Sequence, residues 1–216
     1  VLATEKGSIN FTGPVEHEGG TFTVTASEGS IDLEGSGRIE VNGGPSSFTA
    51  TPTGAGFDGD VSLAGENDFN GPVSIDGRSV SLRNPTALEL GTVSASGDLF
   101  LITGTIAGQS GAITQSGPLT VSGTTSITTN SITTAGYDVV LDAAANDFTG
   151  AVSISAKDLT LVDATALELG ASTVVGDLAL TTGTGEATGG LTQSGALVVG
   201  GTSTFTADGL ANQDAS

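Results

Sequence analysis

The sequence contains no cysteine, methionine or tryptophan, and it has one tyrosine among 216 residues. Without cysteine, the chain can form neither a disulfide bond nor a thiolate metal site. Only five residues are lysine or arginine, against 24 aspartates and glutamates, and the net charge is −19. A surface this acidic repels nucleic-acid phosphates and anionic lipids. We therefore expect no nucleic-acid partner and no membrane insertion.

The sequence also lacks long hydrophobic runs and helical signals. No stretch of about 18 apolar residues is present, as a transmembrane helix would require, and no signal peptide is visible. No segment carries an apolar stripe with the period of an α-helix. The chain opens at Val1, and we interpret it as an internal piece of a longer protein.

The dominant pattern is a strict alternation of apolar and polar residues in short segments, which is typical of strands with one buried face. Glycine, at 34 residues, separates many of these segments and suits tight corners. The pattern predicts an all-β fold with strands at 21–25, 31–33, 38–41, 61–63, 73–75, 80–82, 88–90, 119–121, 152–154, 159–161 and 178–180.

A long unit repeats along the chain. Asn67-Asp68-Phe69 returns as Asn146-Asp147-Phe148, and Leu88-Glu89-Leu90-Gly91 returns at the same spacing as Leu167-Glu168-Leu169-Gly170. The unit is about 79 residues long, and repetition at a fixed period is the signature of a solenoid. We expect one continuous solenoid made of a degenerate unit at 1–66, a unit at 67–145 and an incomplete unit at 146–216.

A shorter and equal step relates Leu99, Leu119 and Val139. Taken as one coil of about 20 residues, this step predicts four coils per unit and about eleven coils in all, roughly 50 Å of rod. Three short strands and three corners per coil predict a parallel β-helix, and the handedness of parallel crossovers makes it right-handed. A propeller would need a unit of about 40 to 50 residues with aromatic signatures, which this chain lacks.

The repeated motifs resemble the repeat shafts of filamentous-haemagglutinin-like bacterial exoproteins, large surface adhesins that are often exported by two-partner secretion. The motifs lie at 145–154, 163–170, 176–178 and 190–207, with a second copy over 66–145. The resemblance implies a right-handed β-helix shaft, an extracellular or bacterial cell-surface location, and an adhesive or scaffolding role. It implies no catalytic residues, because the shaft motifs of that family are structural.

Candidate catalytic groups lack the partners that their chemistry requires. His17 is the only histidine and stands between Glu16 and Glu18, which alternation places on the opposite face; we expect an exposed side chain without a function. Carboxylate pairs for glycoside cleavage would have to come from Glu66/Asp68, Asp58/Asp60 or Asp142/Asp147. Several acids recur with the unit, however, whereas a catalytic site is needed once. We predict that the chain is not an enzyme and has no catalytic, cofactor-binding or metal-binding residues.

The remaining motifs have structural interpretations. Asn67 and Asn146 are expected to form a polar ladder or a corner turn. The phenylalanines are expected to be mostly core plugs: Phe11, Phe22, Phe48, Phe57, Phe69, Phe100, Phe148 and Phe205. Exposed carboxylates could attract Ca²⁺, but the GGxGxD repeat of calcium-binding β-helices is absent. A weakly held calcium ion is the most plausible ligand, and host or matrix glycans are possible partners.

The leading hypothesis is a non-enzymatic shaft segment of a secreted adhesin or matrix fibre, whose partners are neighbouring repeats of the same longer chain. One alternative is a protomer that stacks end to end with identical copies through open strand edges. Another is a β-helix module that binds glycans or a flat surface through rows of threonine. Thr124, Thr125, Thr128, Thr129, Thr133 and Thr134 lie close together in the sequence, which does not favour rows recurring in every coil.

Overall fold

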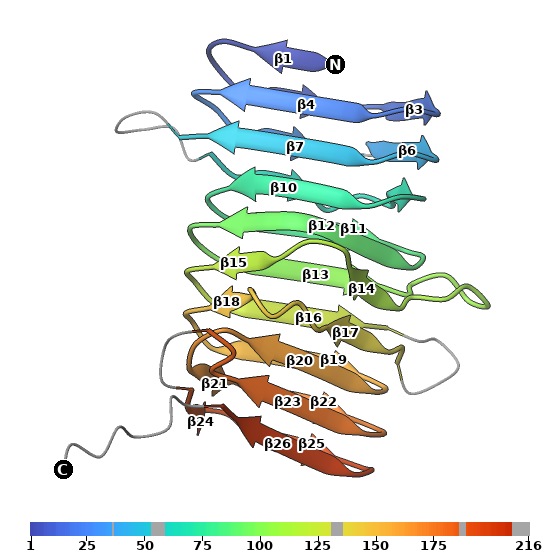
Figure 1. Ribbon diagram of the computed structural model, residues 1–216. Coiled ribbons are helices and arrows are strands. Elements are labelled where there is room, and N and C mark those ends of the chain that lie inside the picture. The colour runs from blue at the N-terminus through green and yellow to red at the C-terminus, as the bar shows by residue number, and fades with distance from the viewer. Residues whose placement is uncertain (36, 53–58, 131–135, 186–188, 209–216) are drawn as a thin grey trace, which may run out of the picture.

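The computed structural model describes residues 1–35, 37–52, 59–130, 136–185 and 189–208. This part of the chain is a parallel β-solenoid of about eight turns, with about 24 residues per turn and no helix. It is consistent with a right-handed parallel β-helix (Figure 1). The predicted all-β fold and the predicted parallel stacking of short strands are confirmed.

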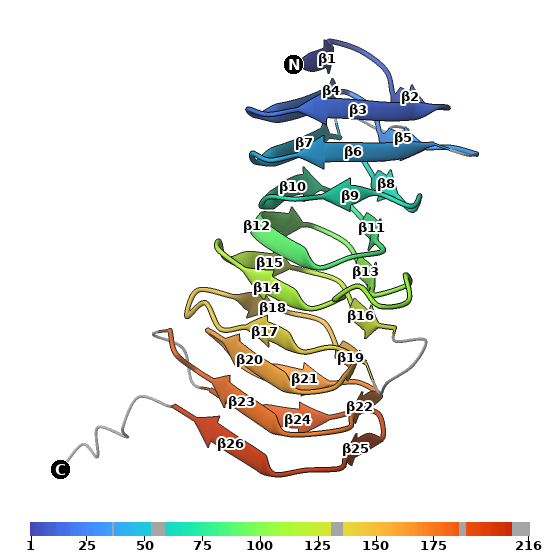
Figure 2. The same ribbon diagram turned by 90° about the vertical axis from the view of Figure 1, so that its right-hand side faces the viewer.

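Each turn places a strand on three faces of the rod, and every strand pairs in parallel with strands one turn away (Figure 2). The first face carries β1 (Leu2–Thr4), β4 (Phe22–Ser27), β7 (Ser46–Thr51), β10 (Val73–Gly77), the end of β12 (Leu88–Ala95), β15 (Leu119–Val121) and β18 (Asp147–Phe148). The second face carries β2 (Ile9–Phe11), β5 (Ile31–Leu33), β8 (Val61–Leu63), β11 (Val80–Asn84), β13 (Leu99–Thr103), β16 (Thr125–Thr129), β19 (Val152–Ala156), β22 (Ser172–Val174) and β25 (Leu197–Val199).

The third face begins with β3 (Pro14–Glu18), β6 (Arg38–Asn42) and β9 (Asp68–Phe69). It continues with the start of β12, β14 (Ile113–Gln115), β17 (Val139–Leu141), β20 (Leu159–Asp163), β23 (Leu178–Thr182) and β26 (Ser203–Ala207). Strands β21 (Leu167–Leu169) and β24 (Leu191–Gln193) complete the last two turns. Strand β12 bends around a corner, because Leu88 pairs with β14 whereas Val93 pairs with both β10 and β15.

The core is a stack of aliphatic columns that run along the rod axis. On the second face, inward side chains meet in register from turn to turn, and they are at most 2% exposed: Leu63, Leu82, Leu101, Ile127 and Ile154. Removing these apolar side chains from water is the main force that holds the turns together. Phe48, Phe69 and Phe148 are also buried, as predicted.

Glycines at one corner let successive turns approach closely. A Cβ atom on Gly71 would lie under 3.0 Å from the carbonyl oxygen of Gly44, and a Cβ atom on Gly150 would collide in the same way with Gly123. The repeat relates Gly44 to Gly123 and Gly71 to Gly150. Part of the high glycine content is therefore a steric requirement of turn stacking that each unit repeats.

The predicted coil length is wrong, and with it the four coils per unit and the eleven coils in the chain. Leu99, Leu119 and Val139 lie on the second, first and third faces, so the short step that relates them joins different faces of the rod. Leu99 stacks instead on Thr125 in the next turn. The apolar alternation is the same on all three faces, and it does not reveal which strands stack. About eight turns correspond to roughly 40 Å of rod.

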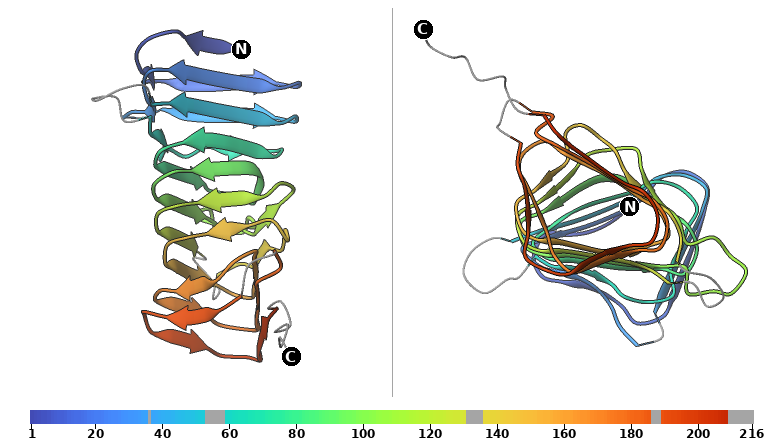
Figure 3. Two further views of the ribbon diagram at one scale, coloured as in Figure 1. Left: turned by 60° about the vertical axis from the view of Figure 1, so that its left-hand side comes forward. Right: turned by 90° about the horizontal axis from the view of Figure 1, so that it is seen from below.

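One repeat unit spans a fractional number of turns. Strands β10 and β19 are equivalent in sequence, yet β10 belongs to the 12-stranded sheet and β19 to the 11-stranded sheet. The equivalent pair β11 and β20 exchange sheets in the opposite direction. The strands from β10 to β18 fill ten positions, since β12 fills two, and three positions make one turn. Each unit is therefore rotated by about one third of a turn relative to the unit before it. Seen along its axis, the rod has a roughly triangular outline (Figure 3).

Candidate functional site

The two repeated asparagines are buried, and the side chain of each forms hydrogen bonds with three successive turns; we call such a residue a staple. Asn67 is 1% exposed; its Oδ1 accepts a hydrogen bond from the Ile39 N–H at 2.9 Å. Its Nδ2 donates to the carbonyls of Leu63 in its own turn and Arg83 in the next turn, at 2.8 and 3.0 Å. Asn146 makes the equivalent bonds. The interpretation as a polar corner is confirmed; the two asparagines do not stack on each other as a ladder.

The recurring acids also bond to neighbouring turns. Asp98 Oδ1 accepts a hydrogen bond from the Thr124 N–H at 2.7 Å, and Asp177 Oδ1 accepts one from the Thr202 N–H at the same distance. Two turns before Asp98, at the same corner as Asp98, Asp60 Oδ1 accepts the Ser79 N–H at 3.0 Å. These carboxylates replace backbone hydrogen-bond acceptors at corners where the regular strand pairing stops.

Basic side chains neutralise some of these corner acids. Hydrogen bonds from Arg78 hold the pKa of Asp60 below its usual value, and Lys157 does the same for the pKa of Asp158. In contrast, burial raises the pKa of Asp32, which also lies near the charges of Glu34 and Asp60. The lowered pKa values keep the stapling carboxylates ionised as acceptors, and they do not indicate proton transfer to a substrate.

The candidate carboxylates for glycoside cleavage bond to different partners in the structure. Glu66 forms an ion pair with Arg83, whereas Asp68 accepts a hydrogen bond from Thr86 Oγ1 at 3.1 Å. Asp142 is exposed, and Asp147 is bonded to Thr165 Oγ1 at 3.4 Å. Asp58 lies outside the described residues. Glu66, Asp68 and Asp147 thus each bond to a partner of their own.

His17 differs from the expectation of an exposed side chain. It is half-buried on the inner side of β3, where its ring lies 5.4 Å from that of Phe22, and Glu16 and Glu18 point outward. The alternation was predicted correctly, but the interior of the first turns has room for the imidazole. In the described part of the chain, no three histidine or acidic side chains come together in a way that could hold a metal ion.

Two phenylalanines depart from the expected core positions. Phe100 is 42% exposed, because it lies between the inward-facing Leu99 and Leu101 and therefore points outward. Phe205 is in register with the buried Leu180, but it is 49% exposed in the last described strand, β26. Phe11 and Phe22 are partly buried against the core, and Phe57 is outside the described residues.

The clustered threonines, whose spacing does not favour rows in every coil, point in different directions. Thr125 and Thr129 point inward and are at most 3% exposed, whereas Thr124 caps the corner bonded to Asp98. Thr133 and Thr134 lie outside the described residues. Because these side chains face in different directions, they do not make a regular outward row.

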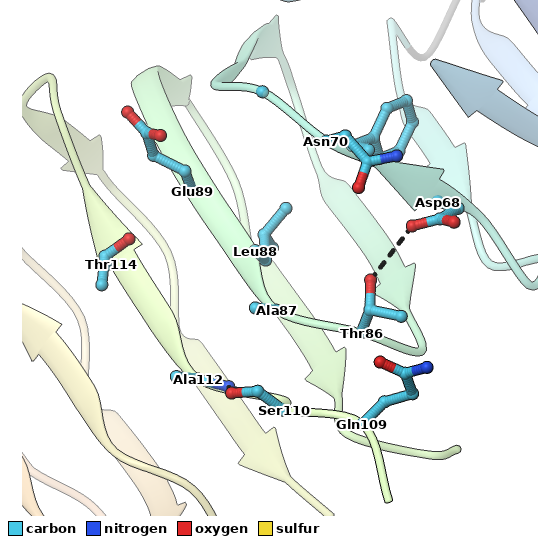
Figure 4. Close-up of a pocket in the computed structure, with 12 residues that line it drawn as sticks. Asp68, Asn70, Thr86, Ala87, Leu88, Glu89, Gln109, Ser110, Ala112 and Thr114 are labelled. Carbon is cyan, nitrogen blue, oxygen red and sulfur yellow. Dashed lines mark hydrogen bonds between the residues drawn. The ribbon is translucent and has the colours of Figure 1, made fainter. Parts of the chain in front are cut away.

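A groove on the side of the rod has a volume of about 490 Å³ (Figure 4). We call it the side groove. It lies on the third face between β9 and β14, and the start of β12 crosses it. It is lined by Asp68, Phe69, Asn70, Gly71, Thr86, Ala87, Leu88, Glu89, Gln109, Ser110, Ala112 and Thr114. Among the described residues, no lysine, arginine or histidine lines it.

The walls of the side groove are fixed by hydrogen bonds outside it. Asn70 Nδ2 donates to Asn42 Oδ1 at 3.2 Å, and Asn42 Nδ2 in turn donates to Glu18 Oε1 at 2.9 Å. At the other wall, the Tyr137 hydroxyl donates to the Gln109 carbonyl at 2.5 Å. Sequence reasoning did not select Asn70, Gln109 or Ser110; the signal available was that Asn70 is replaced by Thr149 in the next unit.

The comparisons place the whole chain in one family. A family described as "Repeats of unknown function (DUF5649)" matches residues 2–76, 77–155 and 156–214. The chain belongs to this family of repeats. The match includes the degenerate N-terminal copy, and its boundaries divide the same array as the units expected at 1–66, 67–145 and 146–216, with a different starting point. Comparison with curated proteins and with solved structures gave no match.

In the described residues, no helix is long and apolar enough to cross a membrane.

Proposed function

We propose that this chain is a structural shaft segment of a secreted bacterial surface adhesin or matrix fibre, and that it has no enzymatic activity. The observation that supports the proposal is that the recurring polar residues form hydrogen bonds between turns. Asn67 and Asn146, Asp68 and Asp147, and Asp98 and Asp177 all bond to a neighbouring turn. The polar residues that recur in this chain thus join successive turns.

The shaft would resist bending and pulling because its cohesion runs along the axis. Parallel strand pairing links every turn to the next, and the aliphatic columns exclude water from the interior. Each further unit of three and one third turns would add about 16 Å of length. The net charge of −19 keeps neighbouring shafts apart at high local density.

The location and export route rest on the resemblance to filamentous-haemagglutinin-like exoproteins. Their shafts carry the same kind of tandem motifs, and their setting is the bacterial cell surface or the surrounding matrix. We extend this setting to the present chain, with two-partner secretion as the proposed route. The absence of cysteine from 216 residues is compatible with it.

The proposed partners are further repeats of one longer chain, which would pair with the strand edges of this segment. The alternative partner is an identical protomer stacked end to end, which would pair with the exposed strand β26. A parallel strand of any origin can add to such an edge. Glycans of a host or matrix are proposed as a secondary partner.

The deciding experiment measures the mass of the denatured polypeptide from its native source and images the native particle by electron microscopy. The shaft proposal predicts a mass far above 21.0 kDa, further copies of the repeat unit, and surface-labelled rods that lengthen by about 16 Å per unit. A mass near 21.0 kDa with long filaments would support the end-to-end protomer instead. A short particle inside the cell, or a glycan-cleaving activity lost on changing Asp68, would contradict both.

A further inference from the structure

The side groove has the size and the fixed walls of a small-ligand site. Its volume of about 490 Å³ lies within the range of roughly 300 to 1,000 Å³ that is usual for such sites. The Asn42 and Tyr137 hydrogen bonds hold Asn70 and the backbone of Gln109 before any ligand arrives. Pre-organised walls lower the entropic cost of binding.

The side chains of the groove select against anions. Asp68 and Glu89 contribute carboxylates, and no cationic side chain among the described residues lines the groove to offset them. A phosphate, sulfate or uronic acid would therefore meet uncompensated negative charge. A ligand rich in neutral hydroxyl groups would instead donate hydrogen bonds to these carboxylates.

Amides and hydroxyls supply the matching donors and acceptors. In Figure 4 the amide oxygen of Asn70 faces the groove, and Gln109 contributes a second amide to its lining. Ser110 and Thr114 add hydroxyls, which can donate or accept. Ala87 and Ala112 also line the groove, and their methyl groups can contact the C–H face of a sugar ring. We propose that the side groove binds a short stretch of a neutral glycan.

Comparison of successive units separates structural residues from those that would select the ligand. Asp68, Thr86, Glu89 and Thr114 recur as Asp147, Thr165, Glu168 and Thr192. The Thr86–Asp68 hydrogen bond recurs with them, which marks this part as a shared framework. Asn70 is replaced by Thr149, so its amide is particular to this turn. Binding at the side groove therefore goes beyond the shaft role, which every unit can serve.

The test is an NMR titration of the 216-residue chain with neutral disaccharides (cellobiose, maltose and chitobiose), with a glucuronate-containing disaccharide, and with Ca²⁺ alone. We expect at least one neutral disaccharide to shift the resonances of Asn70, Thr86 and Gln109. The Asn70→Ala and Gln109→Ala variants should each weaken binding at least about tenfold without changing the melting temperature. Asn10→Ala, which changes an exposed asparagine on the second face, should bind as the parent does.

Four results would overturn the proposal. They are the absence of any shift with millimolar neutral disaccharide, shifts that map away from the side groove, equal binding of the glucuronate disaccharide, and a response to Ca²⁺ alone. None of them would bear on the shaft proposal, which depends on mass and particle shape. Loss of binding in Asn70→Ala together with a normal melting curve would confirm the groove.

Discussion

Asn84 and Asp163 occupy the same position in successive units, and each caps the same buried backbone group. Asn84 Oδ1 accepts the Phe69 N–H at 3.1 Å, and Asp163 Oδ2 accepts the Phe148 N–H at 2.9 Å. Both side chains are 0% exposed. They differ in the second atom: Asn84 Nδ2 donates to the Ala87 carbonyl at 2.7 Å, whereas Asp163 Oδ1 accepts the Thr165 N–H at 2.6 Å. One corner is thus stapled by a neutral amide and the other by a titratable carboxyl.

The Asp163→Asn variant should flatten the dependence of stability on pH. Burial raises the pKa of Asp163 above its usual value of 3.8, although hydrogen bonds from Phe148 and Thr165 oppose the shift. The stability that this group contributes is therefore fully present below pH 3.8 and is lost as the pH rises through the folded-state pKa. In urea unfolding at several pH values, the free energy of unfolding of the variant should rise relative to that of the parent as the pH rises. The difference should reach about 1 kcal/mol at pH 8.

The reciprocal variant, Asn84→Asp, is the matched control. It places a new carboxyl at a fully buried site and removes the donor to the Ala87 carbonyl, so we expect a loss of about 2 kcal/mol at pH 8 and a smaller loss at pH 4. If both variants change stability equally at all pH values, the carboxyl at position 163 does not titrate differently in the folded chain.

Asn67→Ala should be among the most damaging polar substitutions in the chain. The change would leave the Ile39 N–H and the carbonyls of Leu63 and Arg83 without their partner in a buried corner. Unsatisfied buried groups cost about 1–3 kcal/mol each, with partial relief by relaxation, so we expect a loss of about 3 kcal/mol in urea unfolding. Asn10→Ala removes an exposed asparagine with one long bond to Glu34 and should stay within about 0.5 kcal/mol. Equal losses of stability in the two variants would contradict the role of Asn67 in joining the turns.

The sequence predicts whether a side chain points inward or outward better than it predicts which strands stack on each other. Alternation around Phe69 and Phe148 correctly directs both rings inward, and the same rule applied to Leu99-Phe100-Leu101 would have directed Phe100 outward. Stacking is harder, because the length of a turn varies: the turn from Val61 to Val80 is short, whereas the turn from Ile31 to Val61 is much longer. The turns differ in the length of their corner loops, and the alternation of apolar residues does not indicate that length.

The side groove could not be predicted from the sequence either, because the length of the turns varies. Asn70 and Gln109 are far apart in the sequence, and they share a groove only because one short turn and one longer loop separate them. In contrast, the structural role of the recurring acids followed from repetition alone. Asp98 and Asp177 recur with the unit and, as that argument requires, make the same bond to the next turn.

Gly150→Ala should destabilise the rod strongly although it adds only one methyl group. The new Cβ would lie under 3.0 Å from the carbonyl oxygen of Gly123 in the turn before, and the backbone there cannot move without breaking the strand pairing. We expect a loss of more than about 2 kcal/mol by urea unfolding. The control is Gly13→Ala, where no heavy atom lies within 4 Å of the new methyl group; it should be neutral or slightly stabilising. A neutral Gly150→Ala would show that the turns are less closely packed.

The rotation of successive units predicts the symmetry of a longer array. A designed chain of identical copies of residues 67–145 should form a rod in which each unit advances about 16 Å and turns by about one third of a revolution. The same strand, such as the one equivalent to β10, would then return to a given face only every third unit, about 48 Å along the axis. Cryo-electron microscopy of the array would measure both values directly. The alternative of four whole coils per unit predicts no rotation and the same face in every unit, about 19 Å apart. Because a ligand site carried by every unit would point in three directions under the first geometry and in one under the second, this measurement also decides whether such an array binds its surroundings along one side or all around.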